Sequence, residues 1–281
     1  MRTFVISLPE SVDRRARIEQ QLVRQGIAFS FYDAINLNND RNHYFHHCDE
    51  EQFLLNTGRT PMAGELGCFA SHLMLWRTCR LLDEPILILE DDAELADDFA
   101  VAMPFVQRHI KRFGFIRLQR NEKRGKRCIV RQKQRGIEYC TRYPFGLAAY
   151  AITPAVADVF IERSSIFRAP VDVFVKRYWR HGQPLFSLAP AVVNTSPANA
   201  ASTIGARQRV SLSMSQALRR WWHKRCDFVA RGLFNLRWLR AEGKRTTLRL
   251  ARQIRLAGFG AKRELPENAA ASERDRLFQK R

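Results

Sequence analysis

The sequence predicts an α/β protein built around a mostly parallel central sheet, and three observations support this class. Strand patterns at residues 3–8 and 27–32 flank a helix pattern at 14–25, and such a β-α-β opening is typical of parallel sheets. The apolar run 85–89 has the composition of a strand buried on both faces. Three adjacent acids follow it directly, and open α/β sheets bind their ligands where strands end.

The remaining elements follow from local signals along the chain. Gly26 is expected to end the first helix, because glycine readily adopts the left-handed backbone found after helices. Residues 36–62 are polar and predict an irregular loop, whereas the apolar residues of 65–82 recur at helical spacing. Thr153 and Pro154 mark a helix start as N-cap and first-turn proline. The other expected elements are a helix at 97–111, strands at 113–118, 147–152 and 185–190, and a loop at 194–202.

Charge is distributed unevenly along the chain. The 281 residues carry a formal net charge of +19, and residues 206–281 hold 20 Lys and Arg against six Asp and Glu. We therefore expect a nearly balanced folded domain at 1–205 and a basic helical C-terminal region at 206–281. An anionic partner would bind the C-terminal region.

Other compositional signals concern the compartment. No apolar run is long enough for a transmembrane helix, and the first residues lack the apolar core of a signal peptide. The six cysteines are scattered and contain no Cys-x-x-Cys pair, which favours free thiols over a disulfide framework. We therefore expect a cytoplasmic protein.

The C-terminal region carries an apolar stripe at helical spacing, flanked by arginines. Aromatic residues on the apolar side of a basic helix are typical of a helix that lies on an anionic membrane surface. The alternative is that the stripe packs on the domain and leaves the basic face in solvent. Nucleic-acid binding is not favoured, because the region has no recognisable motif for it. The stripe consists of Met214, Leu218, Trp221, Trp222, Val229, Leu233 and Leu236.

The tripeptide Glu90-Asp91-Asp92 is the strongest candidate site. Three neighbouring carboxylates repel one another, and a divalent cation with open positions for a phosphate would explain them. Capping of the following helix is the alternative. Cys68 and His72 have the spacing of helical zinc ligands but lack a third and a fourth ligand. A second cluster is expected to be solvated in a polar loop: His43, His46, His47 and Cys48.

Several motifs occur in a consistent order between residues 3 and 205. They are residues 4–8, Arg14-Arg15, 31–35, 64–68, Ser71-His72, Trp76, 89–92, 146–152 with Pro154, and 170–172. This set resembles glycosyltransferase family 25, the lipooligosaccharide core glycosyltransferases of Gram-negative bacteria. The resemblance implies a GT-A-like, Rossmann-type nucleotide-binding fold, a sugar-nucleotide donor and an inverting transfer.

The resemblance also implies roles for the acidic residues. Glu90 and Asp92 would hold a Mn²⁺ or Mg²⁺ ion that neutralises the departing nucleoside diphosphate. Asp91 would orient the loop or contact the ribose. Asp172 is the expected base that deprotonates the acceptor hydroxyl, and Glu65 is the second candidate. A helix N-terminal carboxylate without a catalytic role is the alternative for Asp172.

The donor pocket is expected from the other matching residues. Arg14 and Arg15 would contact the nucleotide or its phosphates, although surface solvation explains at least one of them equally well. Asp33 and Ala34 would border the uridine pocket, and a loop at 194–203 would close near the diphosphate. The expected donor-site residues are Ser7, Leu8, Arg14, Arg15, Asp33, Ala34, His72, Asp91 and Ser202.

The sequence thus predicts an enzyme that moves a hexose, with galactose as the expected sugar, from a UDP-sugar to a lipooligosaccharide or lipopolysaccharide core. It would act at the inner face of the bacterial inner membrane, held there by the basic C-terminal region. The alternatives are a basic nucleic-acid- or membrane-binding protein on a non-catalytic scaffold, and a metal-dependent phosphohydrolase. The chain lacks the second metal motif of a phosphohydrolase. A phosphorylated acceptor or a generic anion-binding hairpin would explain the basic segment 120–136.

Overall fold

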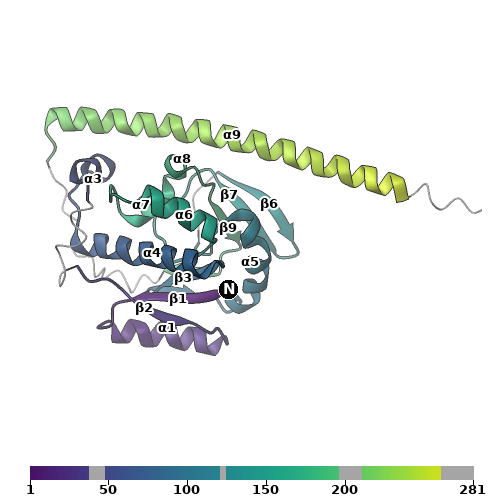
Figure 1. Ribbon diagram of the computed structural model, residues 1–281, viewed down its shortest axis with the longest axis horizontal. Coiled ribbons are helices and arrows are strands. Elements are labelled where there is room, and N and C mark those ends of the chain that lie inside the picture. Colours follow the sequence, from purple (N-terminus) through teal and green to yellow (C-terminus); the bar gives the residue numbers. More distant parts are fainter. Residues whose placement is uncertain (38–47, 121–124, 196–210, 261–281) are drawn as a thin grey trace, which may run out of the picture. The chain divides into compact units, whose positions relative to one another are not determined.

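The computed structural model describes residues 1–37, 48–120, 125–195 and 211–260, with side chains described as far as Gly243 (Figure 1). The chain forms two compact units, Met1–Gly232 and Leu233–Arg281. The first unit contains every described strand, and the described part of the second is helical. The domain boundary predicted after residue 205 lies outside the described residues.

An eight-stranded sheet forms the centre of the first unit. Its strands, in spatial order, are β2 (Ser30–Asp33), β1 (Arg2–Ser7), β3 (Ile86–Glu90), β8 (Ala149–Ile152), β5 (Phe115–Arg117), β9 (Phe186–Ala189), β7 (Arg135–Cys140) and β6 (Lys126–Gln132). Only β8 and β7 run against the other six strands. The predicted mixed α/β fold with a mostly parallel central sheet is therefore confirmed.

Helices cover both faces of this sheet. The described helices of the chain are α1 (Val12–Arg24), α3 (Glu50–Thr57), α4 (Ala63–Leu82), α5 (Phe99–Phe113), α6 (Pro154–Arg163), α7 (Val171–Lys176), α8 (Tyr178–His181) and α9 (Met214–Gly260). Figure 1 shows α4, α6 and α7 on one side of the sheet and α1 on the opposite side. Trp76 of α4, Phe160 of α6 and Phe174 of α7 pack together with ring centroids 5.0 to 5.9 Å apart. This aromatic cluster buries the apolar face of α4 and fixes that helix over the sheet.

Most expected elements occur within a few residues of their predicted bounds. Gly26 follows α1 with φ of +67°, as expected of a helix-ending glycine. The prediction of an unbroken loop over 36–62 is wrong in its second half, where α3 forms. The side chain of Asp49 accepts a hydrogen bond from the Gln52 N–H at 3.0 Å and caps this helix. Only two side chains of this short helix, Phe53 and Leu55, are buried. Two apolar positions are too few to show the spacing of a helix in the sequence.

Two further β features differ from expectation. The predicted loop at 194–202 begins as strand β10 (Val193–Thr195), which pairs with β4 (Ala93–Leu95) in a small antiparallel sheet. The remainder of that loop, residues 196–202, lies outside the described residues. The basic segment 120–136 runs into the hairpin of β6 and β7. Anion binding by this hairpin stays a prediction.

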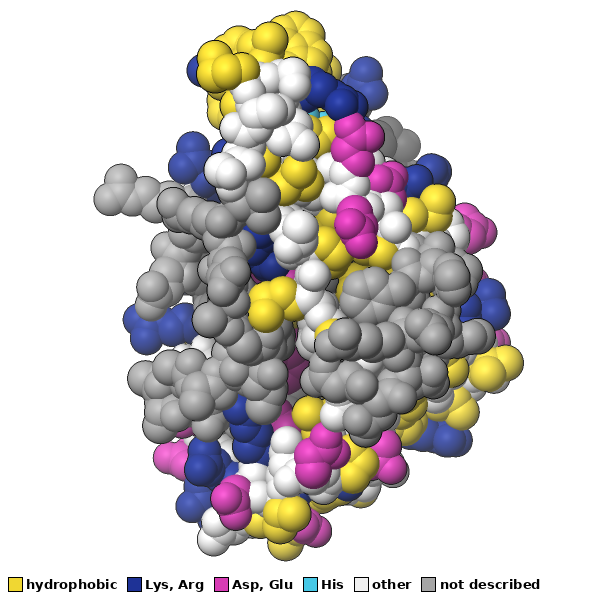
Figure 2. Space-filling view, turned by 90° about the vertical axis from the view of Figure 1, so that its left-hand side faces the viewer, with side chains coloured by type: hydrophobic (Ala, Val, Ile, Leu, Met, Phe, Trp, Pro, Cys, Tyr) yellow, Lys and Arg dark blue, Asp and Glu magenta, His cyan; other side chains and the backbone are white. Residues whose placement is uncertain are grey.

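Helix α9 exposes its apolar side. Within the first unit, Arg220 and Asp227 contact the α/β body, whereas the apolar side chains remain in solvent. The alternative in which the stripe packs on the domain is therefore wrong for these residues. Among the described helices, none is both long enough and apolar enough to cross a bilayer. The exposed apolar residues, which Figure 2 shows gathered where α9 begins, are Met214, Leu218, Trp221, Trp222, Phe228 and Val229.

Candidate active site

The carboxyl ends of β1, β2 and β3 lie side by side at one edge of the sheet. Ser7, the last residue of β1, pairs with Asp33 of β2, and Ile6 pairs with Glu90 of β3. Parallel pairing therefore brings together polar positions that are far apart in the sequence. Ligands of open α/β sheets bind at this edge.

Asp91 is held by groups from β1 and α1. The Ser7 hydroxyl donates to Asp91 Oδ2 at 2.7 Å, and Arg14 Nη1 lies 3.4 Å from Oδ1. The Asp91 N–H also donates to the Ile6 carbonyl at 3.1 Å. These contacts tie Asp91 to β1 and α1, and its expected role, to orient the loop or contact the ribose, stays a prediction.

Arg15 organises the neighbouring part of the edge. Its guanidinium donates to the carbonyls of Ser7 at 2.9 Å and Leu8 at 3.1 Å, and it pairs with the Asp33 carboxylate. The Ala34 N–H donates to the Ser7 carbonyl at 2.9 Å. These bonds hold the ends of β1 and β2 together. Contact of these residues with a nucleotide stays a prediction.

A buried chain of side chains orients Glu90. The Trp76 indole N–H donates to the Tyr150 hydroxyl at 2.9 Å, and that hydroxyl lies 2.9 Å from His72 Nδ1. Because the Tyr150 oxygen accepts from Trp76, its own proton is available to Nδ1. The His72 Nε2–H then donates to Glu90 Oε1 at 3.2 Å. Since His72 is fully buried, its role in this structure is to position Glu90.

Asp92 lacks a partner for part of its carboxylate. Its Oδ1 is buried and has no hydrogen bond within the described residues. Burial, followed by the charges of Glu90 and Asp91, raises the pKa of Asp92 to about 7, and the opposing charge is that of Arg14. A divalent cation fits this site, because it would supply the missing partner and offset the repulsion between the carboxylates.

A second possible ligand set overlaps this one. Ligand atoms of Cys68, His72 and Glu90 lie within 4.8 Å of one another. Glu90 is thus a possible third zinc ligand, which the sequence pattern of Cys68 and His72 did not reveal. However, burial and then the charge of Glu90 raise the pKa of the Cys68 thiol well above its ordinary value. Zinc requires a thiolate and an unprotonated imidazole nitrogen, whereas His72 Nε2 donates to Glu90. The oxygen pair of Glu90 and Asp92 suits a hard cation better.

Asp172 lies in the first turn of α7. It lines a cavity of about 750 Å³. The Gly146 N–H donates to its Oδ2 at 3.1 Å and the Val173 N–H to its Oδ1 at 2.8 Å. Glu65 lines the same cavity, but the guanidinium of Arg59 binds both of its carboxylate oxygens. Asp172 therefore accepts hydrogen bonds from two uncharged backbone groups, whereas Glu65 is paired with a cation.

Cys68 on α4 feels the charge of both groups of acids. Four carboxylates act electrostatically on its thiol, in the descending order Glu90, Asp172, Asp92 and Glu65. Acids from the end of β3 and acids of the cavity thus act on the same thiol.

Some residues of this site gave little or no sign in the sequence. Arg59 falls in the predicted loop, and Tyr150 resembles an ordinary strand aromatic. Arg117 is buried and donates to the carbonyls of Phe145 at 3.2 Å and Gly146, beside the N–H that binds Asp172. An arginine within an apolar strand pattern was the available signal for Arg117. Several predicted residues lie outside the described part of the chain: His43, His46, His47, Ser202 and Thr203.

A sequence model of glycosyltransferase family 25, described as LPS biosynthesis protein, matches residues 1–175, more than half of the chain. The chain belongs to glycosyltransferase family 25. The matched region of this glycosyltransferase includes the strand-end acids as well as Glu65 and Asp172, whereas α9 lies beyond it.

Relatives of this family 25 glycosyltransferase include proteins from Haemophilus and Neisseria. It is 35% identical over 97 residues to the lipooligosaccharide biosynthesis protein lic2B of Haemophilus influenzae, a match that spans 34% of this chain and 35% of that protein. It is 27% identical to the lacto-N-neotetraose biosynthesis glycosyltransferase LgtE of Neisseria meningitidis serogroup B, over 68% of this chain and 73% of LgtE. LgtB of the same organism is 28% identical, over 68% and 74% of the two chains.

Proposed function

We propose that this family 25 glycosyltransferase moves a hexose, galactose, from a UDP-sugar to a lipooligosaccharide or lipopolysaccharide core, with inversion at the transferred carbon. The observation that carries the proposal is the carboxylate of Asp92, which lies beside Glu90, is buried, and has one oxygen without a hydrogen bond among the described residues. The names of the relatives, which refer to lipooligosaccharide and lacto-N-neotetraose biosynthesis, support an oligosaccharide acceptor.

Glu90 and Asp92 would hold the divalent cation, Mn²⁺ or Mg²⁺. When bound, such an ion supplies Lewis acidity to the diphosphate of the leaving group. The chain keeps the two carboxylates in place by separate means: His72 donates to Glu90, while Ser7 and Arg14 fix the adjacent Asp91. Because these partners are preorganised, the acids need little rearrangement to bind a cation.

Asp172 is the proposed base. It would accept the proton of the acceptor hydroxyl while that oxygen bonds to the sugar carbon and the bond from this carbon to the diphosphate oxygen breaks. Attack from the face opposite the leaving group inverts the configuration, and the electron pair leaves with the UDP. Glu65 is the weaker candidate, because Arg59 binds both of its oxygens. The backbone amides of Gly146 and Val173 hold Asp172 in place for this step.

The acceptor is expected to be lipid-linked, with the enzyme held peripherally at the cytoplasmic face of the inner membrane. Two features support a membrane partner. The region after residue 206 is strongly basic, and α9 exposes Trp221 and Trp222 in the first unit. Exposed aromatic side chains beside arginines suit an anionic bilayer surface.

Titration with UDP tests the nucleotide–metal site. With Mn²⁺ at about 1 mM, a concentration suited to weak carboxylate sites, we expect binding that excess chelator abolishes. Asp92→Asn should weaken metal-dependent binding about tenfold or more, the loss expected when a charged ligand worth at least about 1.4 kcal/mol is removed. The matched control is Asp97→Asn, an exposed acid seven residues after Glu90, which should bind UDP like the wild type.

Metal-dependent UDP binding should also change with pH, and the pKa of Asp92 predicts the direction. The pKa of Asp92 is raised to about 7, so its carboxylate is ionised above that pH and protonated below it. A proton competes with the cation, and metal-dependent binding should therefore weaken as the pH falls through about 7. Undiminished Mn²⁺-dependent binding in Asp92→Asn would overturn the carboxylate–metal assignment.

A further inference from the structure

The cavity beside Asp172 is walled partly by the start of α9. One wall comes from the α/β body, with Arg59, Glu65, Phe145 and Lys176, and the facing wall comes from α9 residues between Arg220 and Arg231. At about 750 Å³ it is large enough for a saccharide of more than one ring. Its lining includes the aromatic residues Phe145, Trp179 and Phe228.

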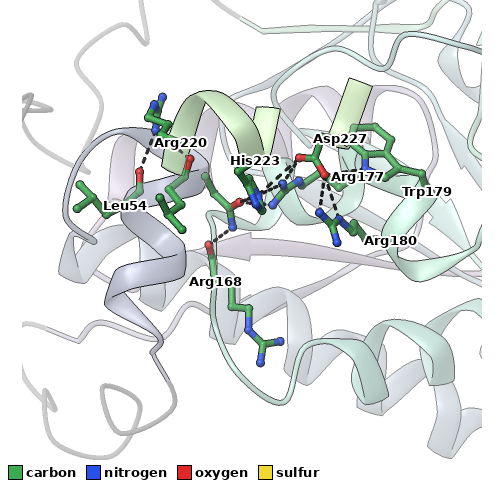
Figure 3. A network of polar contacts seen from close by, with 10 residues as sticks. Leu54, Arg168, Arg177, Trp179, Arg180, Arg220, His223 and Asp227 are labelled. Carbon is green, nitrogen blue, oxygen red and sulfur yellow. Dashed lines mark hydrogen bonds and ion pairs between the residues drawn. The ribbon is translucent and has the colours of Figure 1, made fainter. Parts of the chain in front are cut away.

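The α9 wall is firmly attached to the body. Asp227 accepts hydrogen bonds from the Trp179 indole N–H at 3.1 Å and from Arg180 at 2.8 and 3.0 Å, and it pairs with Arg177. Arg220 donates to the carbonyls of Leu54, Leu55 and Thr57 at the C-terminal end of α3. Figure 3 shows Arg220, His223 and Asp227 reaching from α9 into this network. The start of α9 therefore forms a fixed wall of the cavity.

The lining of this cavity has an excess of positive charge. Three acids, Glu65, Asp172 and Asp227, face twice as many basic side chains. Glu65 and Asp227 are already paired with arginines. The basic residues that line the cavity are Arg59, Lys176, Arg177, Arg220, Lys224 and Arg231.

Lys224 and Arg231 are the cations best placed to bind a ligand. Neither side chain forms an ion pair or hydrogen bond with another described residue, and they lie two turns apart on the same face of α9. Arg231 stacks over Trp179 and Phe228, with its guanidinium carbon 5.8 and 5.5 Å from the ring centroids. Burial and then the charge of Arg220 lower the pKa of Lys224, so a bound anion would stabilise its charged form.

We infer that this cavity is the acceptor site, and that the acceptor saccharide carries an anionic group, a phosphate or a carboxylate, bound by Lys224 and Arg231. The inference rests on the proposed transferase function, because it places the acceptor next to Asp172. Phe145, Trp179 and Phe228 would contact the sugar rings, while the anion fixes which hydroxyl reaches the base. Part of the acceptor specificity is then encoded in α9, outside the region that matches the family.

Titration of the full-length protein with matched sugars tests this. The probes are glucose, glucose 6-phosphate, glucuronate and inorganic phosphate. We expect glucose 6-phosphate or glucuronate to bind about tenfold or more tightly than glucose, as a charge-assisted hydrogen bond predicts. Lys224→Ala combined with Arg231→Ala should abolish the difference. Arg225→Ala is the control, since it removes one positive charge from α9 at a residue outside the cavity lining.

The outcomes separate this inference from the proposed function. Preference for the phosphosugar or for glucuronate supports the inference and identifies the anion. Equal binding of glucose and both anionic sugars overturns it, as does a preference that the double variant retains. Inorganic phosphate binding as tightly as glucose 6-phosphate would also overturn it, because the cavity would then hold an adventitious ion only. Mn²⁺-dependent UDP binding, measured on the same samples, tests the proposed function independently. The double variant should bind UDP like the wild type.

Discussion

At the scale of single residues, Gly67 shows how one missing side chain sets the position of a loop. A Cβ atom at this position would lie 2.3 Å from the Ile35 carbonyl oxygen, which is far inside contact distance. Ser71, one turn later on α4, accepts a hydrogen bond from the Ile35 N–H at 2.9 Å and donates to the Gly67 carbonyl at 2.8 Å. The close approach of α4 thus fixes the chain just after Asp33 and Ala34, at the edge of the candidate donor site.

Gly67→Ala should therefore destabilise the protein. The added methyl group meets backbone, which cannot rotate away, and we expect a loss of about 1–3 kcal/mol in the free energy of unfolding, as for other overpacked sites. Gly232→Ala is the control, because no atom lies within 4 Å of a Cβ there and alanine favours a helix by about 0.5–1 kcal/mol. Chemical denaturation of both variants measures the difference. Equal stability of the two would show that α4 and the loop are not in tight contact.

At the scale of elements, Asp227 and Arg220 are the main attachments of α9 to the body. Asp227 receives hydrogen bonds from Arg177, Trp179 and Arg180, and Arg177 and Asp227 are both mostly buried. Burial alone would raise the pKa of Asp227, but its hydrogen bonds and ion pair with Arg177 lower it below the ordinary value. The carboxylate is therefore ionised near neutral pH and holds the helix electrostatically.

Asp227→Ala should loosen the start of α9, although Arg220 still binds α3. The substitution leaves Arg177 buried without its counter-charge, and we expect a cost of about 2–3 kcal/mol, near the lower end for breaking a buried pair. Hydrogen exchange of residues 214–232 should accelerate. The control is Glu51→Ala, which removes the exposed partner of Arg219 on the same helix and should cost less than about 0.5 kcal/mol. Similar exchange rates in the two variants would contradict a central role for Asp227.

At the scale of the whole molecule, the exposed apolar side of α9 is expected to bind a membrane. Full-length protein should float with vesicles rich in anionic lipid more than with neutral vesicles, and high salt should weaken the charge-dependent part. Trp221→Ser combined with Trp222→Ser should lower vesicle binding about tenfold, since each indole buries apolar area at the bilayer surface. Leu81→Ser, on an exposed leucine of α4, is the control. Unchanged flotation of the double variant would exclude this face.

The sequence alone determined the features that depend on neighbouring residues. The β-α-β opening, the buried strand at 86–90 and the acids after it all follow from short-range patterns of apolar, acidic and glycine residues. Helix α3 and strands β4 and β10 did not, because they are short and their stability comes from contacts with distant segments.

Only the tertiary structure decided how the candidate site is assembled. It showed that Asp91 is tied to Ser7 and Arg14. It also showed that His72 contacts both Tyr150 and Glu90, and that Arg59 pairs with Glu65. It also placed the apolar side chains at the start of α9 in solvent, while Arg220 and Asp227 contact the body. The partner of a polar group depends on which residues lie within hydrogen-bond distance in the folded chain. The sequence contains the residue types and their spacing along the chain, but not these distances.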